Sequence, residues 1–129
     1  MLLPFGNLDM SGRVLAITGG AGGIGKATAL LCAARGARVV IADLDEGQGS
    51  GLVEEIRQSG GEAIFTRTDV SREEDVVAMI ESALAAFGGL HAAFNNAGMN
   101  TGNAALTDLT LDQWQKGISV NLTGVFLCM

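Results

Sequence analysis

The sequence predicts an α/β fold built on a doubly wound parallel sheet. Short apolar segments alternate with segments of helical pattern along the 129 residues, and such alternation is typical of βαβ units joined by right-handed crossovers. The apolar segments are continuous rather than alternating, as expected for strands that are covered on both faces. Because the chain is short, it can form one domain with a modest core.

The first half of the chain supplies two strand–helix units. Residues 13–18 (RVLAIT) predict a short strand that ends at glycines, and residues 24–35 predict a helix that stops at Gly36. Residues 37–43 (ARVVIAD) predict the second strand. The second helix covers residues 46–59 and ends at a pair of glycines, although three further glycines weaken its first turns.

The second half repeats this order. Residues 62–69 predict the third strand. Ser71 and Glu74 predict a capping box at the start of the third helix, which ends at Gly88. Residues 90–98 predict the fourth strand, and its apolar core (LHAAF) is typical of an interior strand rather than a sheet edge.

A last helix begins at a second capping box, formed by Thr110 and Gln113. In the doubly wound strand order 3-2-1-4-5-6, these elements supply only 3-2-1-4. We therefore expect residues 1–129 to be a partial domain from which the C-terminal strands and the substrate region are absent.

Composition argues against several function classes. The net charge of −6 disfavours nucleic acid or an anionic membrane as the main partner, and no apolar run reaches the ~18 residues that span a bilayer. Residues 1–13 lack the pattern of a secretion signal. Cys32, Cys128 and His91 make a poor zinc set, so we expect no metal site. These features favour a cytoplasmic protein.

The glycine cluster after the first strand carries the strongest functional signal. Glycine lets a backbone approach a ligand closely, and the N-terminus of the following helix offers free N–H groups to a phosphate. Residues 20–25 match the general G-x-G-x-x-G dinucleotide pattern, and residues 18–25 match a second register, T-G-x-x-x-G-x-G. A P-loop is excluded because Lys26 is followed by Ala27. A glycine-rich turn without a ligand is the alternative.

Asp43 strengthens the dinucleotide interpretation. It ends the second predicted strand, 18 positions after Gly25, near the spacing of about 20 at which an acidic residue binds the adenosine ribose. Its charge would repel a 2′-phosphate, and no basic residue lies in 19–25 or directly after Asp43. The sequence therefore favours NAD over NADP. The alternative is an ordinary solvated aspartate in an acidic turn.

Four motifs occur in a fixed order along the chain: TGGAGGIG at 18–25, Asp69-Val70 after the third strand, NNAG at 95–98, and Asn121 within SVNLTGVF. Together they resemble the short-chain dehydrogenase/reductase family, over nearly the whole chain from about Ser11 onward. The resemblance selects the T-G-x-x-x-G-x-G register and implies the Rossmann form of the doubly wound fold.

The resemblance also implies which residues bind the cofactor, NAD. It implies that the pyrophosphate is bound by Gly19, Gly22, Gly23 and Ile24, with Gly25 closing the motif, and that the adenosine ribose is bound by Asp43, beside Leu44. It also implies that the adenine contacts Asp69 and Val70, and that the ribose and nicotinamide side is lined by Asn95, Ala97 and Gly98. The amides of Asn95 and Asn96 can also bridge neighbouring strand ends, and we expect both roles for Asn95.

Most of the catalytic residues that the family uses have no counterpart here. Asn121 matches the asparagine that holds a water in the proton relay, whereas the serine, the tyrosine and its lysine would lie beyond Met129. The chain contains no tyrosine, and its only lysines are Lys26 and Lys116. We therefore expect no general acid/base within these residues.

Two functions are compatible with these features. The first is an NAD-dependent oxidoreductase that transfers a hydride between the nicotinamide and a secondary alcohol or ketone, with residues 1–129 as its cofactor-binding part. The resemblance implies that such an enzyme is a homo-oligomer, because the last helix commonly forms a subunit interface in the family. The alternative is a catalytically inactive, truncated homologue that binds nucleotide or pairs with an intact subunit.

Overall fold

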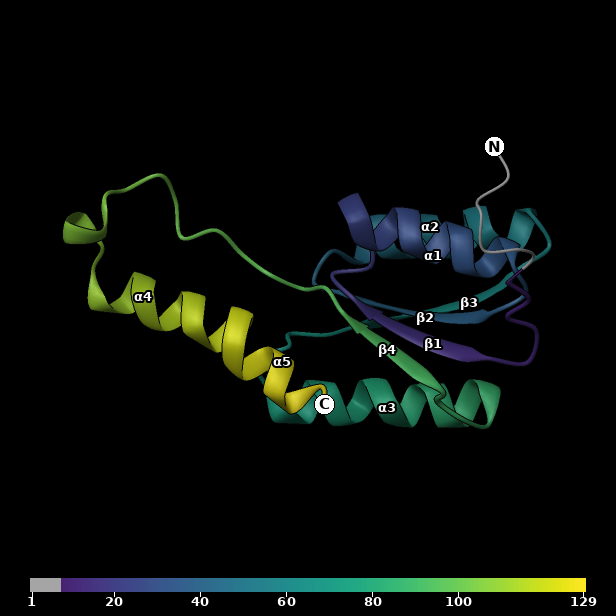
Figure 1. The fold of residues 1–129 in the computed structure, drawn as a ribbon. Coiled ribbons are helices and arrows are strands. Elements are labelled where there is room, and N and C mark those ends of the chain that lie inside the picture. Colours follow the sequence, from purple (N-terminus) through teal and green to yellow (C-terminus); the bar gives the residue numbers. More distant parts are fainter. Residues whose placement is uncertain (1–7) are drawn as a thin grey trace.

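Four parallel strands form the centre of the structure, a computed structural model that describes residues 8–129 (Figure 1). The strands are β1 (Val14–Thr18), β2 (Arg38–Asp43), β3 (Glu62–Arg67) and β4 (Ala92–Asn95). They lie in the order β3-β2-β1-β4 and are all parallel, which confirms the order predicted from the sequence. Residues 1–7, part of the N-terminal stretch without a secretion-signal pattern, lie outside the described residues.

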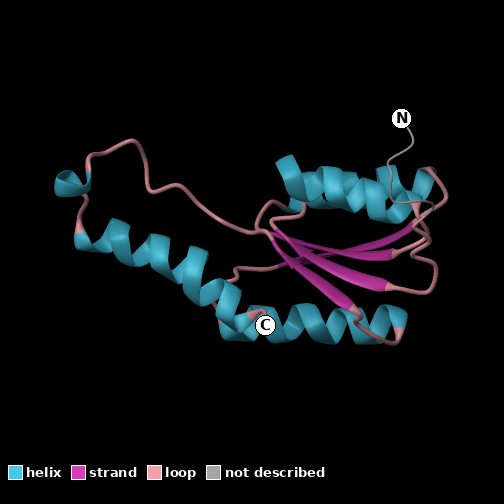
Figure 2. Cartoon of the chain, in the orientation of Figure 1, coloured by secondary structure: helices cyan, strands magenta, loops and turns pink. Residues whose placement is uncertain are grey.

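Helices cover both faces of this sheet (Figures 1 and 2). Two helices, α1 (Gly23–Ala34) and α2 (Glu46–Gln58), lie on one face, and α3 (Glu73–Phe87) lies on the other. The remaining elements are η1 (Leu106–Asp108), α4 (Leu111–Ile118), the π-helical turn η2 (Ser119–Thr123) and α5 (Gly124–Leu127). At the end of the chain, Leu127 and Cys128 pack against the core on the α3 face.

The sheet divides the core into two layers, because its central strands are buried on both faces. Ile41 packs with Ile56 of α2 on one face, whereas the preceding residue, Val40, packs with Val76 of α3 on the other. This two-sided burial explains why the apolar runs in the sequence are continuous. Because all the strands are parallel, their carboxyl ends meet at one edge of the sheet.

One of the two predicted capping boxes forms. At the start of α4 the Thr110 Oγ1 accepts a hydrogen bond from the Gln113 backbone N at 3.2 Å, and the Gln113 side chain accepts one from the Thr110 backbone N at 2.9 Å. The box predicted at Ser71 is wrong. The Ser71 hydroxyl donates instead to the Asp69 carboxylate at 2.6 Å, and Arg72 becomes the N-cap residue of α3 without a side-chain cap.

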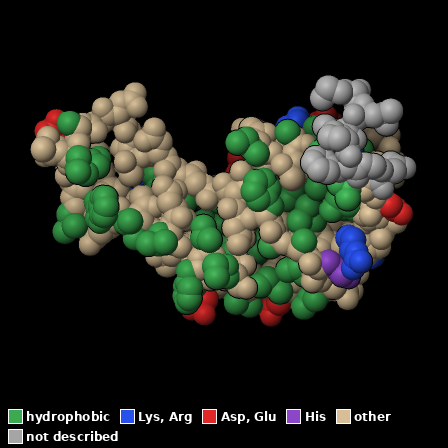
Figure 3. Space-filling model, viewed as in Figure 1, with side chains coloured by type: hydrophobic (Ala, Val, Ile, Leu, Met, Phe, Trp, Pro, Cys, Tyr) green, Lys and Arg blue, Asp and Glu red, His purple; other side chains and the backbone are tan. Residues whose placement is uncertain are grey.

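The last helical segment is not the single helix that the sequence predicts. The π-helical turn η2 separates α4 from α5, and Figure 2 shows α4 and the loop before it extending away from the sheet. We call residues 106–127 the helical arm. Hydrophobic side chains are exposed along this arm (Figure 3), among them Trp114, Leu122 and Phe126.

The fourth strand is shorter than the predicted 90–98 and lies at an edge of the described sheet. It pairs with β1 alone, and both Ala92 and Ala93 are exposed. This edge position is the one that the predicted order 3-2-1-4 gives to the fourth strand. Phe94, by contrast, packs against the core on the α1–α2 face.

Candidate functional site

The carboxyl ends of the strands border a cleft of about 540 Å³. This is the edge at which open α/β sheets bind their ligands. Many of the residues predicted to bind a cofactor line it: Gly19, Gly22, Asp43, Leu44, Asp69, Val70, Ala97 and Gly98. The predicted residues Gly23, Ile24, Gly25, Asn95 and Asn121 do not line the cleft.

Two glycines of the motif are required by the packing of the chain itself. Gly19 has a φ of +61°, and a Cβ on it would lie 2.9 Å from the Ala97 Cα. A Cβ on Gly25 would collide with the Gly19 carbonyl oxygen. These glycines therefore let β1, α1 and the loop after β4 approach one another closely.

Gly22 has no such explanation within the protein, whereas Gly23 has a φ of +52°, a backbone conformation that favours glycine. A Cβ on Gly22 would meet only the Gln48 Oε1 at 3.6 Å, and a Cβ on Gly23 would meet nothing within 4 Å. The first turn of α1, which begins here, has no side-chain cap and no acidic residue. Its free N–H groups and positive dipole end suit a phosphate. The open space at Gly22 leaves the N-terminus of α1 accessible from the cleft that Gly22 lines.

Substituting Gly25 or Gly22 by alanine should separate the effect on stability from the effect on nucleotide binding. Gly25→Ala should lower the free energy of unfolding by about 1–3 kcal/mol, since the new methyl group overpacks the loop. Gly22→Ala should leave stability nearly unchanged, because its φ of −143° suits any residue, but should weaken nucleotide binding. Chemical denaturation of both variants tests this. Equal destabilisation by the two changes would contradict it.

Asp43 holds the glycine loop onto the end of β2. Its Oδ2 accepts a hydrogen bond from the Ala21 backbone N at 3.0 Å, and its Oδ1 accepts one from the Asp45 backbone N at 3.1 Å. Each oxygen can accept a further hydrogen bond, and Asp43 lines the cleft. The bond from Ala21, 22 residues away in sequence, distinguishes Asp43 from a solvated turn aspartate, and a carboxylate at this place can accept hydrogen bonds from ribose hydroxyls.

Asp69 and Val70 form the opposite wall. The Asp69 Oδ1 accepts hydrogen bonds from the Ser71 hydroxyl at 2.6 Å and the Ser71 backbone N at 3.0 Å. The Ser71 hydroxyl is the main reason that the pKa of Asp69 lies below its usual value. Val70 is buried, and it touches α5 where a Cβ on Gly124 would lie 2.7 Å from its Cγ2. Asp69 therefore stays ionised, with its Oδ2 available as an acceptor.

The bridge between the ends of β1 and β4 is made by Asn96, not by Asn95. The Asn96 Nδ2 donates to the backbone oxygens of Thr18 at 3.1 Å and Gly19 at 3.0 Å. The Asn95 Oδ1 is buried without a hydrogen-bond partner among the described residues, so the bridging role expected for Asn95 is wrong. Thr18 was also missed as a site residue, and its hydroxyl accepts from the Ala97 backbone N at 3.1 Å.

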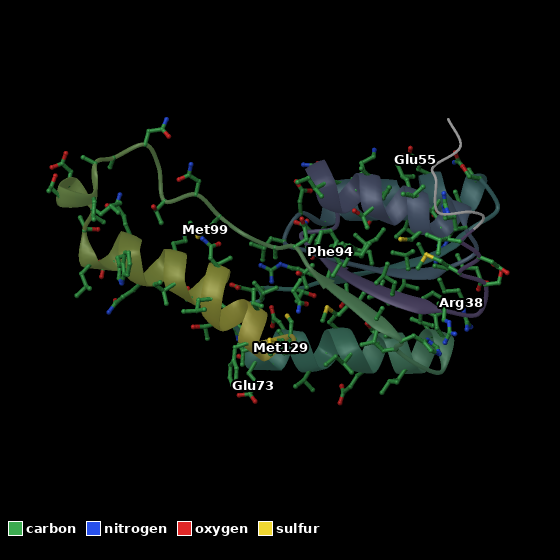
Figure 4. All side chains as sticks on the ribbon, viewed as in Figure 1. Arg38, Glu55, Glu73, Phe94, Met99 and Met129 are labelled. Carbon is green, nitrogen blue, oxygen red and sulfur yellow. The ribbon has the colours of Figure 1, made fainter. Side chains whose placement is uncertain are left out.

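Asn121 lies in the π-helical turn and fixes the loop after β4. Its Oδ1 accepts from the Met99 backbone N at 2.8 Å, and its Nδ2 donates to the Met99 backbone oxygen at 2.9 Å. Met99 lies on the loop that leads from β4 to the helical arm (Figure 4). One turn earlier, a Cβ on Gly117 would lie 2.8 Å from the Thr101 side chain. The Asn121 amide therefore joins the arm to the cleft-lining segment 96–99.

Comparison with known proteins identifies the family. The family model described as short chain dehydrogenase matches residues 13–129, which is most of the chain. The chain belongs to the short chain dehydrogenase family. This result confirms the resemblance that the four ordered motifs indicate, and the comparisons support oxidoreductase chemistry for the family.

Two named dehydrogenases are similar in sequence to nearly the whole of this chain. A 2,5-dichloro-2,5-cyclohexadiene-1,4-diol dehydrogenase of Sphingobium indicum is 43% identical over 121 residues, which is 94% of this chain and 47% of the relative. A cis-4-hydroxycyclohexanecarboxylate dehydrogenase of Sinomonas cyclohexanicum is 44% identical over 90% of this chain and 46% of the relative. The chain spans about half the length of these relatives.

A solved short chain dehydrogenase structure has the same fold. A short-chain type dehydrogenase/reductase from Mycobacterium marinum superposes with a TM-score of 0.89 at 36% identity, over 93% of this chain and 48% of that one. Among residues 8–129 of the present structure, no helix is long and apolar enough to cross a membrane. The same part of the chain holds no group of three or more His, Cys, Asp or Glu side chains arranged to bind a metal ion.

Proposed function

We propose that residues 1–129 form the NAD-binding part of an oxidoreductase that interconverts a secondary alcohol and a ketone. The observation that carries this proposal is the pairing of open space at Gly22 with the Asp43 carboxylate on one cleft. A pyrophosphate requires the first feature, and a ribose with a free 2′-hydroxyl is bound by the second. When bound, the nicotinamide supplies the hydride acceptor or donor.

The chain's own residues would bind and orient this cofactor along the cleft. The N-terminus of α1 binds the pyrophosphate, and Asp43 accepts hydrogen bonds from the adenosine ribose beside Leu44. Val70 would pack against the adenine, and Asp69 would accept a hydrogen bond from it. The small residues Ala97 and Gly98 leave room for the nicotinamide side.

Asn121 acts in this proposal as a positioning residue. Both ends of its amide are engaged by the Met99 backbone, so its side chain holds the segment that lines the nicotinamide side. Each end of the amide keeps one further hydrogen-bonding position, so a water of a proton relay could be held by the amide or by the backbone carbonyl of Asn121. The general acid/base lies outside residues 1–129, which contain no tyrosine.

The substrate class we propose is a cyclic secondary alcohol or the matching ketone. The names of two relatives support it, since they describe dehydrogenases of a cyclohexadiene diol and of cyclohexanol. Met99 lines the cleft directly after Gly98, so in this proposal a small apolar ring beside the nicotinamide would contact it. We further propose a cytoplasmic homo-oligomer that associates through the helical arm.

A second function is favoured by one observation, the exposed hydrophobic side chains of the helical arm. A chain without the catalytic tyrosine could pair through this arm with an intact subunit and bind nucleotide without turnover. The intact mass of the protein isolated from its source distinguishes the two functions. A chain of about 250 residues indicates the dehydrogenase.

Cofactor preference gives the sharpest test of the site. NAD should bind more tightly than NADP, because Asp43 faces the position of the 2′-phosphate. Asp43→Asn keeps an oxygen for the Ala21 backbone N but removes the charge, and should narrow the difference by about 1–3 kcal/mol. Calorimetric titration of both variants with both cofactors measures it. Equal affinities for NAD and NADP in the unmutated protein would overturn the assignment.

A further inference from the structure

A basic residue lies closer to the ribose end of the cleft than the sequence indicates. Arg67 ends β3, and its Cα is the register partner of Asp43 on β2. The two residues are separated by a whole helix in sequence, so no local pattern brings them together. A shallow hollow beside the cleft is lined by Leu44, Asp45, Glu46 and Arg67.

The hollow continues the cleft at the point where a ribose would lie. Leu44 lines both, and it directly follows Asp43. A group attached to the ribose 2′-oxygen would therefore extend past Asp43 into the hollow, toward Arg67.

The Arg67 side chain is free to meet such a group. It is 55% exposed, and its ion pair with the Asp75 Oδ2 is long, at 4.0 Å. The same Asp75 oxygen already accepts a hydrogen bond from the Asp69 backbone N at 2.9 Å, and Arg72 approaches the other oxygen at 3.8 Å. Asp75 thus holds Arg67 weakly, since an exposed pair of this length contributes little.

We propose that Arg67 is a specificity-determining residue: a latent partner for a 2′-phosphate, opposed by the charge of Asp43. Guanidinium binds phosphate through paired, charge-assisted hydrogen bonds. In the unmutated protein the carboxylate at Asp43, with Asp45 and Glu46 in the hollow, outweighs this attraction. Removing the Asp43 charge would let Arg67 bind the phosphate. This inference rests on the proposed cofactor site.

The test is a double-mutant cycle on the 129-residue chain, with NAD and NADP as probes, because these differ only in the 2′-phosphate. Asp43→Asn should raise the affinity for NADP about tenfold or more, and Asp43→Asn with Arg67→Gln should lose most of that gain. Affinity for NAD should be the same with and without Arg67→Gln. Arg57→Gln is the matched control, since Arg57 is similarly exposed and loosely paired but lies at the far end of α2.

The outcomes are distinguishable. An equal gain in NADP affinity with and without Arg67 overturns the role of Arg67, whereas absence of NAD binding by the folded, unmutated chain overturns the proposed function and this inference with it. If Asp43→Asn loosens the glycine loop and lowers NAD binding, the single substitution Arg67→Gln tests the role of Arg67 instead. It should reduce the residual affinity for NADP at least threefold more than Arg57→Gln does, and an equal effect of the two changes contradicts the proposal.

Discussion

Residues 1–129 alone should oxidise no alcohol above background, whereas the same residues joined to the C-terminal half of the Sphingobium indicum relative should be active with NAD. The family resemblance assigns the serine, the tyrosine and its lysine to that second half. A general acid/base contributes about 10²–10⁴-fold to rate, so its loss with the serine should remove detectable turnover. Formation of reduced cofactor with a panel of cyclic alcohols measures both proteins.

The fusion of residues 1–129 to the C-terminal half of the relative, here called the chimera, can be tested with a pair of glycine variants. Gly22→Ala in the chimera should raise the KM for NAD, because it places a methyl group where the pyrophosphate fits, while Gly51→Ala on the open side of α2 should not. Robust turnover by the purified 129-residue chain would show that the chemistry has been misplaced.

The isolated chain should associate in solution. The edge of β4 offers unpaired backbone groups as a template for another strand, and large hydrophobic side chains are exposed along the helical arm and at the end of the chain: Leu111, Trp114, Leu122, Phe126 and Met129. Exposed apolar surface of this kind favours association. Size-exclusion chromatography with light scattering should therefore report oligomers.

A pair of variants locates the surface responsible. Leu122→Gln with Phe126→Gln should reduce the association, whereas Leu84→Gln on α3, which is 50% exposed, should leave it unchanged. A monodisperse, cooperatively melting monomer of the unmutated chain would contradict the expectation that residues 1–129 are a partial domain.

The order of the strands and the position of the glycine loop could be predicted from sequence because both depend on local signals. Continuous apolar runs mark strands buried on both faces, and glycine marks the places where the backbone turns or another segment approaches. These signals placed the glycine loop between β1 and α1 and Asp43 at the end of β2. The packing contacts of Gly19 and Gly25 and the hydrogen bond from Ala21 to Asp43 emerged only from the structure.

Other features depend on which of two neighbouring residues makes a given hydrogen bond. The capping box at Ser71 failed because the Asp69 carboxylate, two residues away, takes the hydroxyl hydrogen bond. Bridging was expected of both Asn95 and Asn96, but only Asn96 bridges. Consecutive residues at a strand end point to opposite faces, and the pattern NNAG does not say which one faces β1.

The residue-by-residue register between strands could not be predicted. Arg67 lies beside Asp43 only through the register of β3 with β2, and a scan for basic residues next to the glycine motif cannot detect it. The hydrogen bonds between the Asn121 side chain and the Met99 backbone likewise depend on the π-helical turn, which no motif in the sequence indicates.

Calorimetric titration of NAD into the folded 129-residue chain tests the central claim, that these residues form a nucleotide site, most directly. We predict saturable binding at one site per chain, which Gly22→Ala weakens at least tenfold and Gly51→Ala leaves unchanged. Circular dichroism and a cooperative melt on the same samples establish that each variant is folded. Absence of binding by the folded, unmutated chain, or equal binding by the Gly22→Ala and Gly51→Ala variants, would contradict the account.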